Sequence, residues 1–391
     1  MDLEARIRRR QRRDGEPRLI LDYEALSPTS HVEEPVNRGP ILERLLNYLD
    51  PVFDGKLPPN AYLHGPKGSG KSAVVTALFT HLNRLSTERR PVIYTSTRVQ
   101  SPMSPVFVYV DARRTPSEFA FYHAVLDALV EERPPKSGIG TGTLKSRLHG
   151  VLGGSRVGVV VAIDHLGEPG TLAEEAFVDL FAGLPSNASW LAIGRSPPSE
   201  TVLTTYTAES IRMEAYQRQI LVDVLMTRAS NGIAQRALSH GVARDIADWA
   251  DGDAHDALAA LFGAADEATA NDRDAITSAD VDAGTEAVPR PCISLGRVVA
   301  LPANRQRVLR RLLDLDVDER SSVQAASERI SETVDLSTAT VKRILYELSE
   351  DGITRRVTAE RVDGKGRPPS RLEPCFPTAV FERLYALNRR D

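Results

Sequence analysis

The residues with the clearest chemical meaning form one glycine-rich segment, Gly65-Pro66-Lys67-Gly68-Ser69-Gly70-Lys71-Ser72. The segment fits the pattern G-x-x-x-x-G-K-[ST], in which backbone N–H groups surround phosphates and the lysine reaches the outer phosphates. The hydroxyl of Ser72 would ligate Mg²⁺, and the N-terminus of the following helix adds its dipole. The pattern predicts a nucleotide-binding loop, and the alternative is a glycine-rich turn that binds nothing.

A loop of this kind works with an acidic residue at the end of a neighbouring strand, which helps to hold the Mg²⁺ ion. The apolar run 157–163 ends at Asp164, so we expect Asp164 to hold Mg²⁺ together with Ser72. The alternative role for Asp164 is a helix cap or a turn. His165 follows, where many ATPases carry a glutamate that polarises the attacking water; the alternative is a plain surface histidine.

Short apolar runs alternate with helical patterns around these residues. The predicted strands are 61–64, 106–110, 157–163 and 190–193, and helices are predicted after Gly70 and over 117–130. Near-continuous Val and Ile runs between helices are typical of a parallel sheet covered on both faces. The sequence therefore predicts an α/β P-loop domain with a parallel sheet over residues 36–212.

Three other regions differ from this pattern. Residues 1–35 are polar and rich in Arg, and predict an extended basic arm. Residues 213–288 show no convincing strand and place Ala, Leu and acids at helical spacing, which predicts a helical lid domain. Prolines introduce the last region, residues 289–391, which we interpret as a winged-helix DNA-binding domain.

The winged-helix interpretation depends on three helical patterns followed by two strands. Helices are predicted over 305–315 and 322–333, and a third begins after the cap Ser337. Strands 353–359 and 371–376 flank a turn rich in Gly and Pro. Candidate DNA contacts lie on the outer side of the third helix and on the wing, and they are Thr338, Thr340, Lys342, Arg343, Lys365, Arg367 and Arg371. Many winged helices bind protein instead, and that alternative stays open.

Composition excludes several classes of protein. The chain has 391 residues, 41% of them hydrophobic and 26% charged, which favours two or three globular domains. Two cysteines cannot build a disulfide scaffold or a zinc site alone. We expect a cytoplasmic protein without a membrane segment, because no apolar stretch approaches the roughly 20 residues of a span. Formal charge is +3 over residues 1–20 and +2 over residues 301–391, against −4 in total, so a polyanionic partner should meet the ends.

The order of these parts resembles the archaeal initiators related to the origin recognition complex and the cell-division-control loader, which belong to the AAA+ ATPases. The resemblance covers about residues 15–391, and the segments that carry it are 35–38, 57–60, the P-loop, 134–138, Asp164 and 216–228. It implies ATP or ADP with Mg²⁺ as ligands and double-stranded DNA as a partner, with the replicative helicase or other replication proteins as further candidates. It also implies that Tyr216 and Arg228 help to enclose the nucleotide; the alternative is a packed Tyr and a solvated Arg.

Four positions depart from the family pattern. His165 replaces the Walker B glutamate, Gly194-Arg195 stands at the polar sensor, Thr201 lies near the arginine-finger position, and His255 replaces the lid arginine. Each missing group would act on charge that develops during phosphoryl transfer. We therefore expect nucleotide binding to survive better than hydrolysis, with at most a weak ATPase.

The sequence supports two functional hypotheses. The first is a nucleotide-dependent DNA-binding initiator that recognises origins and regulates replication. The second is a degenerate paralogue that acts as a DNA-binding regulator with a structurally bound nucleotide. A small-molecule phosphotransferase is a weaker third hypothesis, because no substrate-binding insertion is evident.

Overall fold

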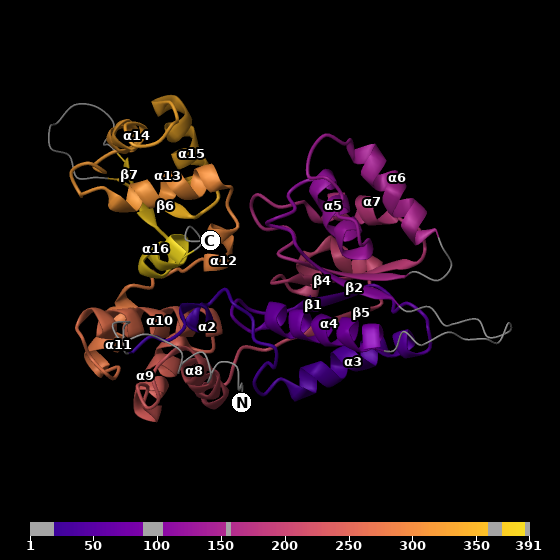
Figure 1. Cartoon of the computed structure of the whole chain (residues 1–391), viewed down its shortest axis with the longest axis horizontal. Helices are drawn as coiled ribbons and strands as arrows, with labels where there is room; N and C mark the ends of the chain where they lie inside the picture. Colours follow the sequence, from indigo (N-terminus) through magenta and orange to yellow (C-terminus); the bar gives the residue numbers. More distant parts are fainter. Residues whose placement is uncertain (1–18, 89–104, 154–157, 359–369, 388–391) are drawn as a thin grey trace. The chain divides into compact units, whose positions relative to one another are not determined.

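The computed structural model describes residues 19–88, 105–153, 158–358 and 370–387 (Figure 1). The chain divides into two compact units. One comprises residues 31–215, and the other comprises residues 1–30 together with 216–391. Among the described residues, no helix is both long and apolar enough to cross a bilayer.

The first unit is built on a five-stranded parallel sheet with the strand order β2-β3-β4-β1-β5. The expected strands are present, and the strand that the sequence pattern missed is β5, which lies at the sheet edge and buries only Ile211. Every residue of β3 is buried, as the continuous Val/Ile run predicts. The strands are β1 (Ala61–His64), β2 (Val106–Asp111), β3 (Val159–Asp164), β4 (Ala188–Gly194) and β5 (Glu209–Arg212).

Helices cover both faces of this sheet (Figure 1). Helices α3 (Gly39–Phe53) and α4 (Lys71–Glu88) pack on one face, where Leu45, Val74 and Phe79 are buried against β1 and β3. Helices α5 (Glu118–Leu129), α6 (Thr141–Leu152) and α7 (Glu174–Ala182) supply the core of the other face. Two short 3₁₀ helices, η1 (Pro198–Glu200) and η2 (Val202–Tyr206), precede β5.

Strand register places the chemically interesting residues at one edge of the sheet. Asp164 ends β3 opposite Ile193, and Gly194 ends β4 opposite His64. The P-loop follows His64 directly, so the loop and Asp164 lie at the carboxyl ends of strands β1 and β3. Strand β4 separates those two strands, and ligands of open α/β sheets bind at this end.

The second unit contains the predicted helical region. Its longest helix, α10, buries a dense set of small residues that includes Ala257, Ala260 and Ala264, and α11 packs closely against it at Gly284. The helices of this region are α8 (Arg218–Gly232), α9 (His240–Ala250), α10 (Ala254–Ala270) and α11 (Ser278–Glu286).

Part of the expected N-terminal arm is folded into the second unit. Leu19 and Leu26 are buried, and the short helix α2 (Tyr23–Leu26) packs on α8. The N–H of Leu21 donates to the carbonyl of Gly232, where any side chain would collide with Leu26. The prediction of an extended arm up to residue 35 therefore does not describe this stretch, because its few apolar residues supply core contacts. Residues 1–18 lie outside the described part.

The C-terminal segment has the predicted order of three helices and a hairpin. In α15 the side chains of Val341, Ile344, Leu345 and Leu348 are buried, as the helical spacing predicts. Strands β6 and β7 pair antiparallel. The elements are α12 (Leu295–Val299), α13 (Ala303–Asp314), α14 (Val323–Ser331), α15 (Thr338–Glu350), β6 (Thr354–Thr358), β7 (Ser370–Pro374) and α16 (Thr378–Leu387). The wing turn, with Lys365 and Arg367, lies outside the described residues.

Candidate functional site

The P-loop connects β1 to α4, as the sequence predicts, and its glycines are required by the backbone. Gly65 has φ +155°, and a Cβ there would lie 2.0 Å from the carbonyl oxygen of Met213. Gly68 and Gly70 have φ +69° and +87°, in the region that favours glycine. The loop can therefore turn tightly and present backbone N–H groups at the N-terminus of α4, where anions are favoured.

The side chain of Lys71 lies against the inside of this loop. Its Nζ donates to the carbonyl oxygens of Gly65 and Pro66, at 2.7 and 2.8 Å, and lies 3.3 Å from Ser69 Oγ. Lys71 is almost fully buried. A buried ammonium held by loop carbonyls is a positive charge fixed at the mouth of the predicted phosphate site.

Arg38 fixes the other side of the loop. Its guanidinium donates to the carbonyl oxygen of Ser69 at 2.5 Å and to that of Glu214 at 3.4 Å. The segment before α3 thus contacts the P-loop and the end of β5 together. The sequence analysis used residues 35–38 only as a mark of resemblance and did not assign this contact.

Ser72 and Asp164, predicted as the Mg²⁺ ligands, lie in direct contact. Ser72 Oγ donates to Asp164 Oδ2, and the hydroxyl of Tyr109 on β2 donates to the same oxygen at 2.7 Å. Burial would raise the pKa of the Asp164 carboxyl, but the charge of His165 and the bonds from Ser72 and Tyr109 lower it. The result is an ionised carboxylate beside a hydroxyl, both oxygen donors of the kind that Mg²⁺ takes, so the residues present fit the ion.

Tyr109 was not predicted as part of the site. Burial and the neighbouring carboxylate raise its pKa well above the ordinary value, so it stays a neutral hydrogen-bond donor. It lies in the middle of an apolar strand pattern, where a tyrosine is indistinguishable from a core residue. Only the pairing of β2 with β3, which places Tyr109 opposite Ala162, brings it to Asp164.

His165 is part of a chain of polar side chains that the sequence pattern did not indicate. Its Nδ1 lies 3.2 Å from Glu168 Oε1, and its Nε2 lies 3.5 Å from Asp164 Oδ2. Arg195, which follows β4, lies 3.0 Å from the same Glu168 oxygen. Burial would raise the pKa of Glu168, but the bond to His165 and the charge of Arg195 lower it to about 2. Two departures from the family pattern, His165 and Arg195, therefore meet on one carboxylate.

The polar-sensor position is closed by packing. A Cβ on Gly194 would lie 2.5 Å from the hydroxyl of Tyr62, which donates to the carbonyl of Ser196 at 2.8 Å. Any side chain at residue 194 would displace Tyr62. The glycine at this position is thus tied to the tyrosine that fills the space beside it.

The side chain of Thr201, near the expected arginine-finger position, makes hydrogen bonds within the first unit. Its hydroxyl donates to Glu174 Oε2 at 2.6 Å and accepts from the N–H of Leu203 at 3.2 Å. These bonds join α7 to η2 and start the 3₁₀ turn. No charged finger is available at this residue.

Tyr216 and Arg228 lie in the second unit. Tyr216 is buried, and its N–H donates to the carbonyl oxygen of Gly252. The guanidinium of Arg228 donates to the carbonyl oxygens of Ser27 and Ser30, and burial lowers its pKa to about 10. Arg228 is therefore not a solvated side chain, because it ties α8 to the chain that follows α2.

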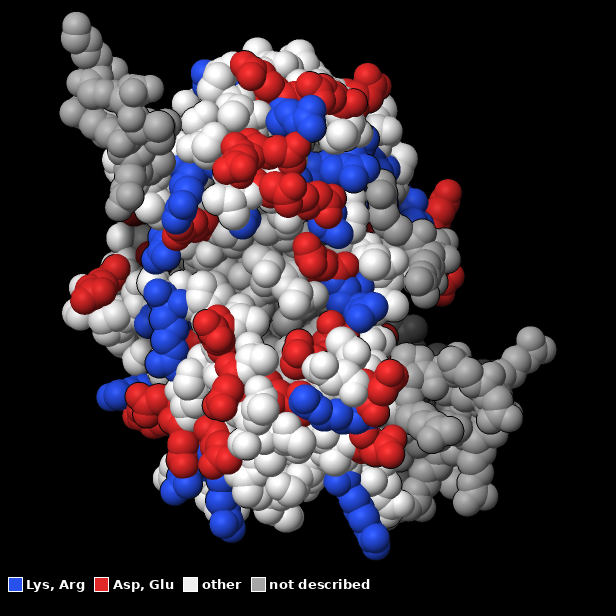
Figure 2. Space-filling view, turned by 90° about the vertical axis from the view of Figure 1, so that its left-hand side faces the viewer, with Lys and Arg blue, Asp and Glu red and all other residues white. Residues whose placement is uncertain are grey.

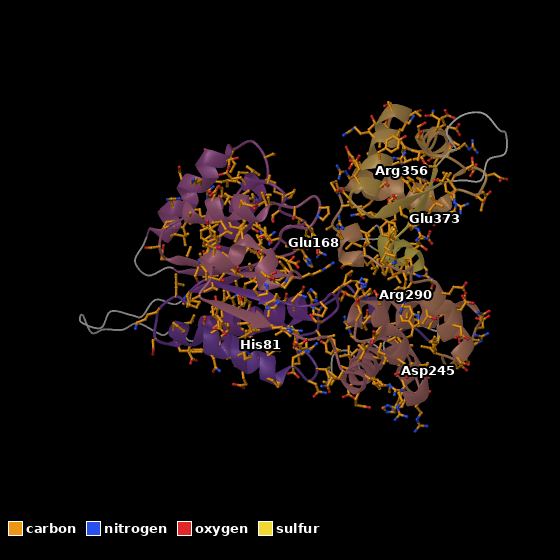
Figure 3. All side chains as sticks on the ribbon, turned by 180° about the vertical axis from the view of Figure 1, so that it is seen from behind. His81, Glu168, Asp245, Arg290, Arg356 and Glu373 are labelled. Carbon is orange, nitrogen blue, oxygen red and sulfur yellow. The ribbon has the colours of Figure 1, made fainter. Side chains whose placement is uncertain are left out.

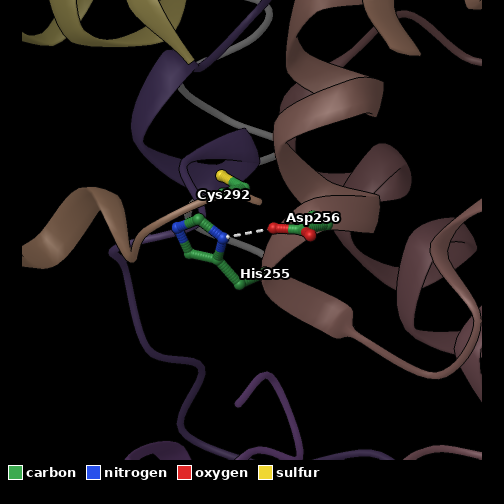
Figure 4. Close-up of side chains that lie close together, drawn as sticks. All are labelled: His255, Asp256 and Cys292. Carbon is green, nitrogen blue, oxygen red and sulfur yellow. Dashed lines mark hydrogen bonds and ion pairs between the residues drawn. The ribbon is translucent and has the colours of Figure 1, made fainter. Parts of the chain in front are cut away.

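His255 uses both ring nitrogens inside the second unit (Figure 4). Nδ1 lies 2.9 Å from Asp256 Oδ1, and Nε2 accepts the N–H of Leu295 at 2.8 Å. The Sγ of Cys292 lies near both side chains, so the three residues have the spacing of metal ligands. Since Nε2 is the acceptor, the ring proton is on Nδ1, and the His255 ring has no lone pair left to bind an ion. His255 instead joins the lid helix α10 to the first turn of α12.

The candidate DNA contacts on α15 have partners within the C-terminal segment. Lys342 donates to Gln324, Arg343 pairs with Glu347, and the hydroxyls of Thr338 and Thr340 bond to neighbouring serines. Arg371 pairs with Glu373, which also pairs with Arg355; Glu373 and the neighbouring Arg356 are labelled in Figure 3. Figure 2 shows basic and acidic side chains interspersed over the face it presents. Exposed pairs of this kind stabilise by less than about 1 kcal/mol, so these bases can exchange partners at little cost.

Comparison with known proteins identifies the domain and the fold. Residues 34–193 match the AAA ATPase domain family. An ORC1-type DNA replication protein of Sulfurisphaera tokodaii is 24% identical over an alignment 398 positions long, which covers 96% of this chain and 94% of that protein. These matches confirm the resemblance on which the sequence analysis relied.

Solved structures agree with this identification. The Aeropyrum pernix Orc1 protein in complex with DNA has a TM-score of 0.62 at 21% identity, and the match covers 96% of this chain and 98% of that one. The Aeropyrum pernix ORC2 protein in ADPNP and ADP complexes has a TM-score of 0.55 at 16% identity, with 95% of this chain and 100% of that one covered. The chain thus has the archaeal Orc1/Cdc6 type of AAA+ fold, with a parallel five-stranded sheet and a helical region after it.

Proposed function

We propose that this protein, which carries an AAA ATPase domain, is a nucleotide-dependent DNA-binding protein of the replication-initiator type. The observation that carries the nucleotide part is the P-loop with its buried Lys71, next to a Ser72 hydroxyl bonded to the ionised Asp164. Support for the DNA part comes from relatives named as replication proteins and from a solved structure titled as a complex with DNA. The protein acts in the cytoplasm, with replication proteins as candidate partners.

In this proposal the phosphates of ATP or ADP lie in the P-loop, residues Gly65 to Ser72. Backbone N–H groups of the loop and the Lys71 ammonium hold them, and Lys71 exchanges its loop carbonyls for phosphate oxygens. Ser72 and Asp164 hold Mg²⁺, which would neutralise phosphate charge when bound. The buried Tyr109 keeps the Asp164 carboxylate oriented.

Tyr216 and Arg228 of the lid complete the nucleotide enclosure in the same proposal. Arg228 acts through its bonds to the main chain after α2, which fix α8 and with it the adjoining Tyr216. Substitution of Arg228 should therefore lower the stability of the second unit as well as nucleotide affinity. A change in affinity alone would identify a direct contact with the ligand.

For DNA, we propose that α15 enters the major groove of a winged-helix domain. Thr338, Thr340, Lys342 and Arg343 would face base edges, while Lys365, Arg367 and Arg371 would contact phosphates. Arg371→Ala should weaken binding to all sequences alike and lower the salt slope by about one unit. Arg343→Ala should instead change sequence preference. DNA affinity that is unaffected by both changes would indicate a protein-binding domain.

A second candidate, a regulator with a structurally bound nucleotide, is favoured by one group of observations. Tyr62 fills the space beside Gly194 at the sensor position. The hydroxyl of Thr201 donates to Glu174, and the ring of His255 accepts the N–H of Leu295. Genomic footprinting with and without ATP separates the two candidates. Protection of a replication origin supports the initiator, and protection of promoters supports the regulator.

A further inference from the structure

Three regions of the second unit that lie far apart in the sequence meet at Asp266. Tyr23 comes from α2, Asp266 from α10 of the helical region, and Arg383 from α16 of the C-terminal segment. We propose that residues 19–30 form a strap, anchored on the helical region, that ends in a latch. The latch is the contact of Arg383 with Tyr23 and Asp266, and it holds the C-terminal segment and can release it. The proposal does not depend on nucleotide or DNA binding.

One end of the strap is fixed to the last residue of α8. The N–H groups of Leu21 and Asp22 both donate to the carbonyl oxygen of Gly232, at 2.8 and 3.0 Å. Leu26 is fully buried, and a Cβ at residue 232 would lie 2.6 Å from its Cγ. The strap therefore occupies a notch in α8 that the absence of a side chain at Gly232 leaves open.

The other end of the strap is fixed by Arg228, which lies one turn earlier on α8. Its guanidinium donates to the carbonyl oxygens of Ser27 and Ser30, and the arginine is buried. If the strap left α8, a buried cation would lose both acceptors, and a buried group without its partner bears the full cost of desolvation. The strap is therefore a firm attachment.

The latch is built from contacts that are open to solvent. Arg383 pairs with Asp266 at 2.7 Å, and its guanidinium lies over the ring of Tyr23, 5.0 Å from the ring centroid. The hydroxyl of Tyr23 lies 3.5 Å from the same oxygen of Asp266, and the centroids of the Tyr23 and Phe262 rings are 5.6 Å apart. The side chain of Arg383 is 43% exposed, so water and salt compete for its ion pair.

The two sets of contacts differ in how easily they break. The bonds of Arg228 are buried, whereas an exposed ion pair and a cation–π contact at the surface exchange their partners for water at little cost. We therefore expect the latch to open while the strap keeps its place on α8. Tyr23 then stays beside Phe262 on the helical region, and Arg383 leaves with α16.

A second connection between the two regions lies at the start of α12. Nε2 of the buried His255, on α10, accepts the N–H of Leu295, which is also buried. Arg297 of α12 donates to the main-chain carbonyl of Asp351, and α12 contacts α16, so α12 belongs to the C-terminal segment. When the latch opens, the connection between His255 and Leu295 remains, and it is the pivot about which the segment turns.

The test measures the distance distribution between two spin labels by double electron–electron resonance, on the full chain without ligand. The labels are noncanonical amino acids at two exposed positions, Asp245 on α9 and Glu328 on α14, so both native cysteines stay in place; Asp245 is labelled in Figure 3. A closed latch gives one narrow distribution, and an open latch adds a second, broad population. We expect the narrow distribution for wild type at low salt.

Variants open the latch from its two sides. Arg383→Leu should raise the ratio of open to closed molecules by about tenfold, because it removes the ion pair and the cation–π contact together. Tyr23→Leu should raise the ratio less, since the ion pair remains, and the double variant should not exceed Arg383→Leu, because Tyr23 holds the segment through Arg383. Tyr23→Phe keeps the aromatic face and should resemble wild type.

The matched control is Arg311→Leu. Arg311 is a similarly exposed arginine of the C-terminal segment, and it pairs with Asp314 of its own helix. This variant should leave the distance distribution unchanged. Hydrogen exchange then reports on the strap, because the N–H groups of Leu21 and Asp22 should stay as protected in Arg383→Leu as in wild type.

Three results would overturn the proposal. The first is a folded Arg383→Leu variant with the wild-type distance distribution. The second is loss of protection at Leu21 and Asp22 in that variant, since strap and segment would then open together. The third needs no variant: a wild-type distribution that stays narrow when salt rises from about 0.05 M to about 1 M, where charges are screened beyond about 3 Å. Each result leaves the proposed function standing, because no ligand takes part in the measurement.

Discussion

Two halves of the site in the first unit have different kinds of contact. In the binding half, Gly65, Lys71, Ser72 and Asp164 keep the residue types of the P-loop pattern, and their polar atoms meet at one edge of the sheet. In the other half, at positions that the family resemblance assigns to hydrolysis, the residue types differ: Thr201 bonds to Glu174, and Tyr62 fills the space beside Gly194. A P-loop can thus keep its ligand-binding chemistry while the groups that act on the transition state change.

The difference between the halves has a physical basis. Binding needs loop geometry and fixed charges, which the backbone of β1 and α4 supplies locally. Hydrolysis needs preorganised polar groups that are aimed at the place where charge develops in the transition state. The hydroxyl of Thr201 is directed at Glu174, and Tyr62 fills the space at Gly194, so neither position supplies such a group.

The largest expected effect is a loss of nucleotide affinity on substitution in the binding half. Lys71→Ala should lower nucleotide affinity by about 100-fold, because charge-assisted bonds to phosphate contribute roughly 1.5–3 kcal/mol and the loop carbonyls lose their donor. Titration of a fluorescent ATP analogue measures the change. Lys56→Ala, at an exposed lysine of the same unit, should leave affinity unchanged. Unchanged affinity in Lys71→Ala would remove the nucleotide assignment.

In the other half, introducing a polar side chain at the sensor position should lower the free energy of unfolding. Gly194→Asn should destabilise it by about 1–3 kcal/mol, because the new Cβ overlaps the Tyr62 hydroxyl. Urea unfolding measures the loss. In the Tyr62→Phe background the same substitution should cost less, since the nearest atom is gone. An Asn variant as stable as wild type and faster in hydrolysis would show that the sensor position is open.

His255 distinguishes a structural histidine from a lid sensor. His255→Ala should lower the free energy of unfolding by about 1–3 kcal/mol, because the N–H of Leu295 loses its acceptor in a buried setting. Thermal unfolding shows this against His240→Ala, an exposed histidine of the same unit. Nucleotide affinity should change little. A large loss of affinity with unchanged stability would restore the sensor role.

The smallest expected effect is a dependence of protein stability on pH that comes from Glu168. Its folded pKa of about 2 lies below the ordinary value of about 4.5, so its stabilising contribution is present above pH 4.5 and is lost as pH falls toward 2. The difference in urea midpoint between wild type and Glu168→Gln should therefore shrink over that range. A difference that stays constant from pH 6 to pH 3 would show that Glu168 is not held ionised by His165 and Arg195.

Sequence alone predicted the parts that depend on local pattern. The P-loop, strand β3 with Asp164, and the buried face of α15 could be predicted because each depends on the spacing of residues close together in the sequence. The partners of those residues did not follow, because they come from register and packing. Tyr109 reaches Asp164 through strand pairing, Arg195 reaches Glu168 from β4, and Leu26 is buried because Gly232 leaves room for it.

Single-turnover hydrolysis with protein in excess over radiolabelled ATP tests the central claim, that this site binds nucleotide and turns it over very slowly. The account predicts that ATP binds with Mg²⁺ and remains largely intact over many minutes, and that His165→Glu raises the rate only modestly because Gly194, Thr201 and His255 stay unsuited. Wild-type turnover on the order of 1 s⁻¹, ordinary for an enzyme, would contradict it.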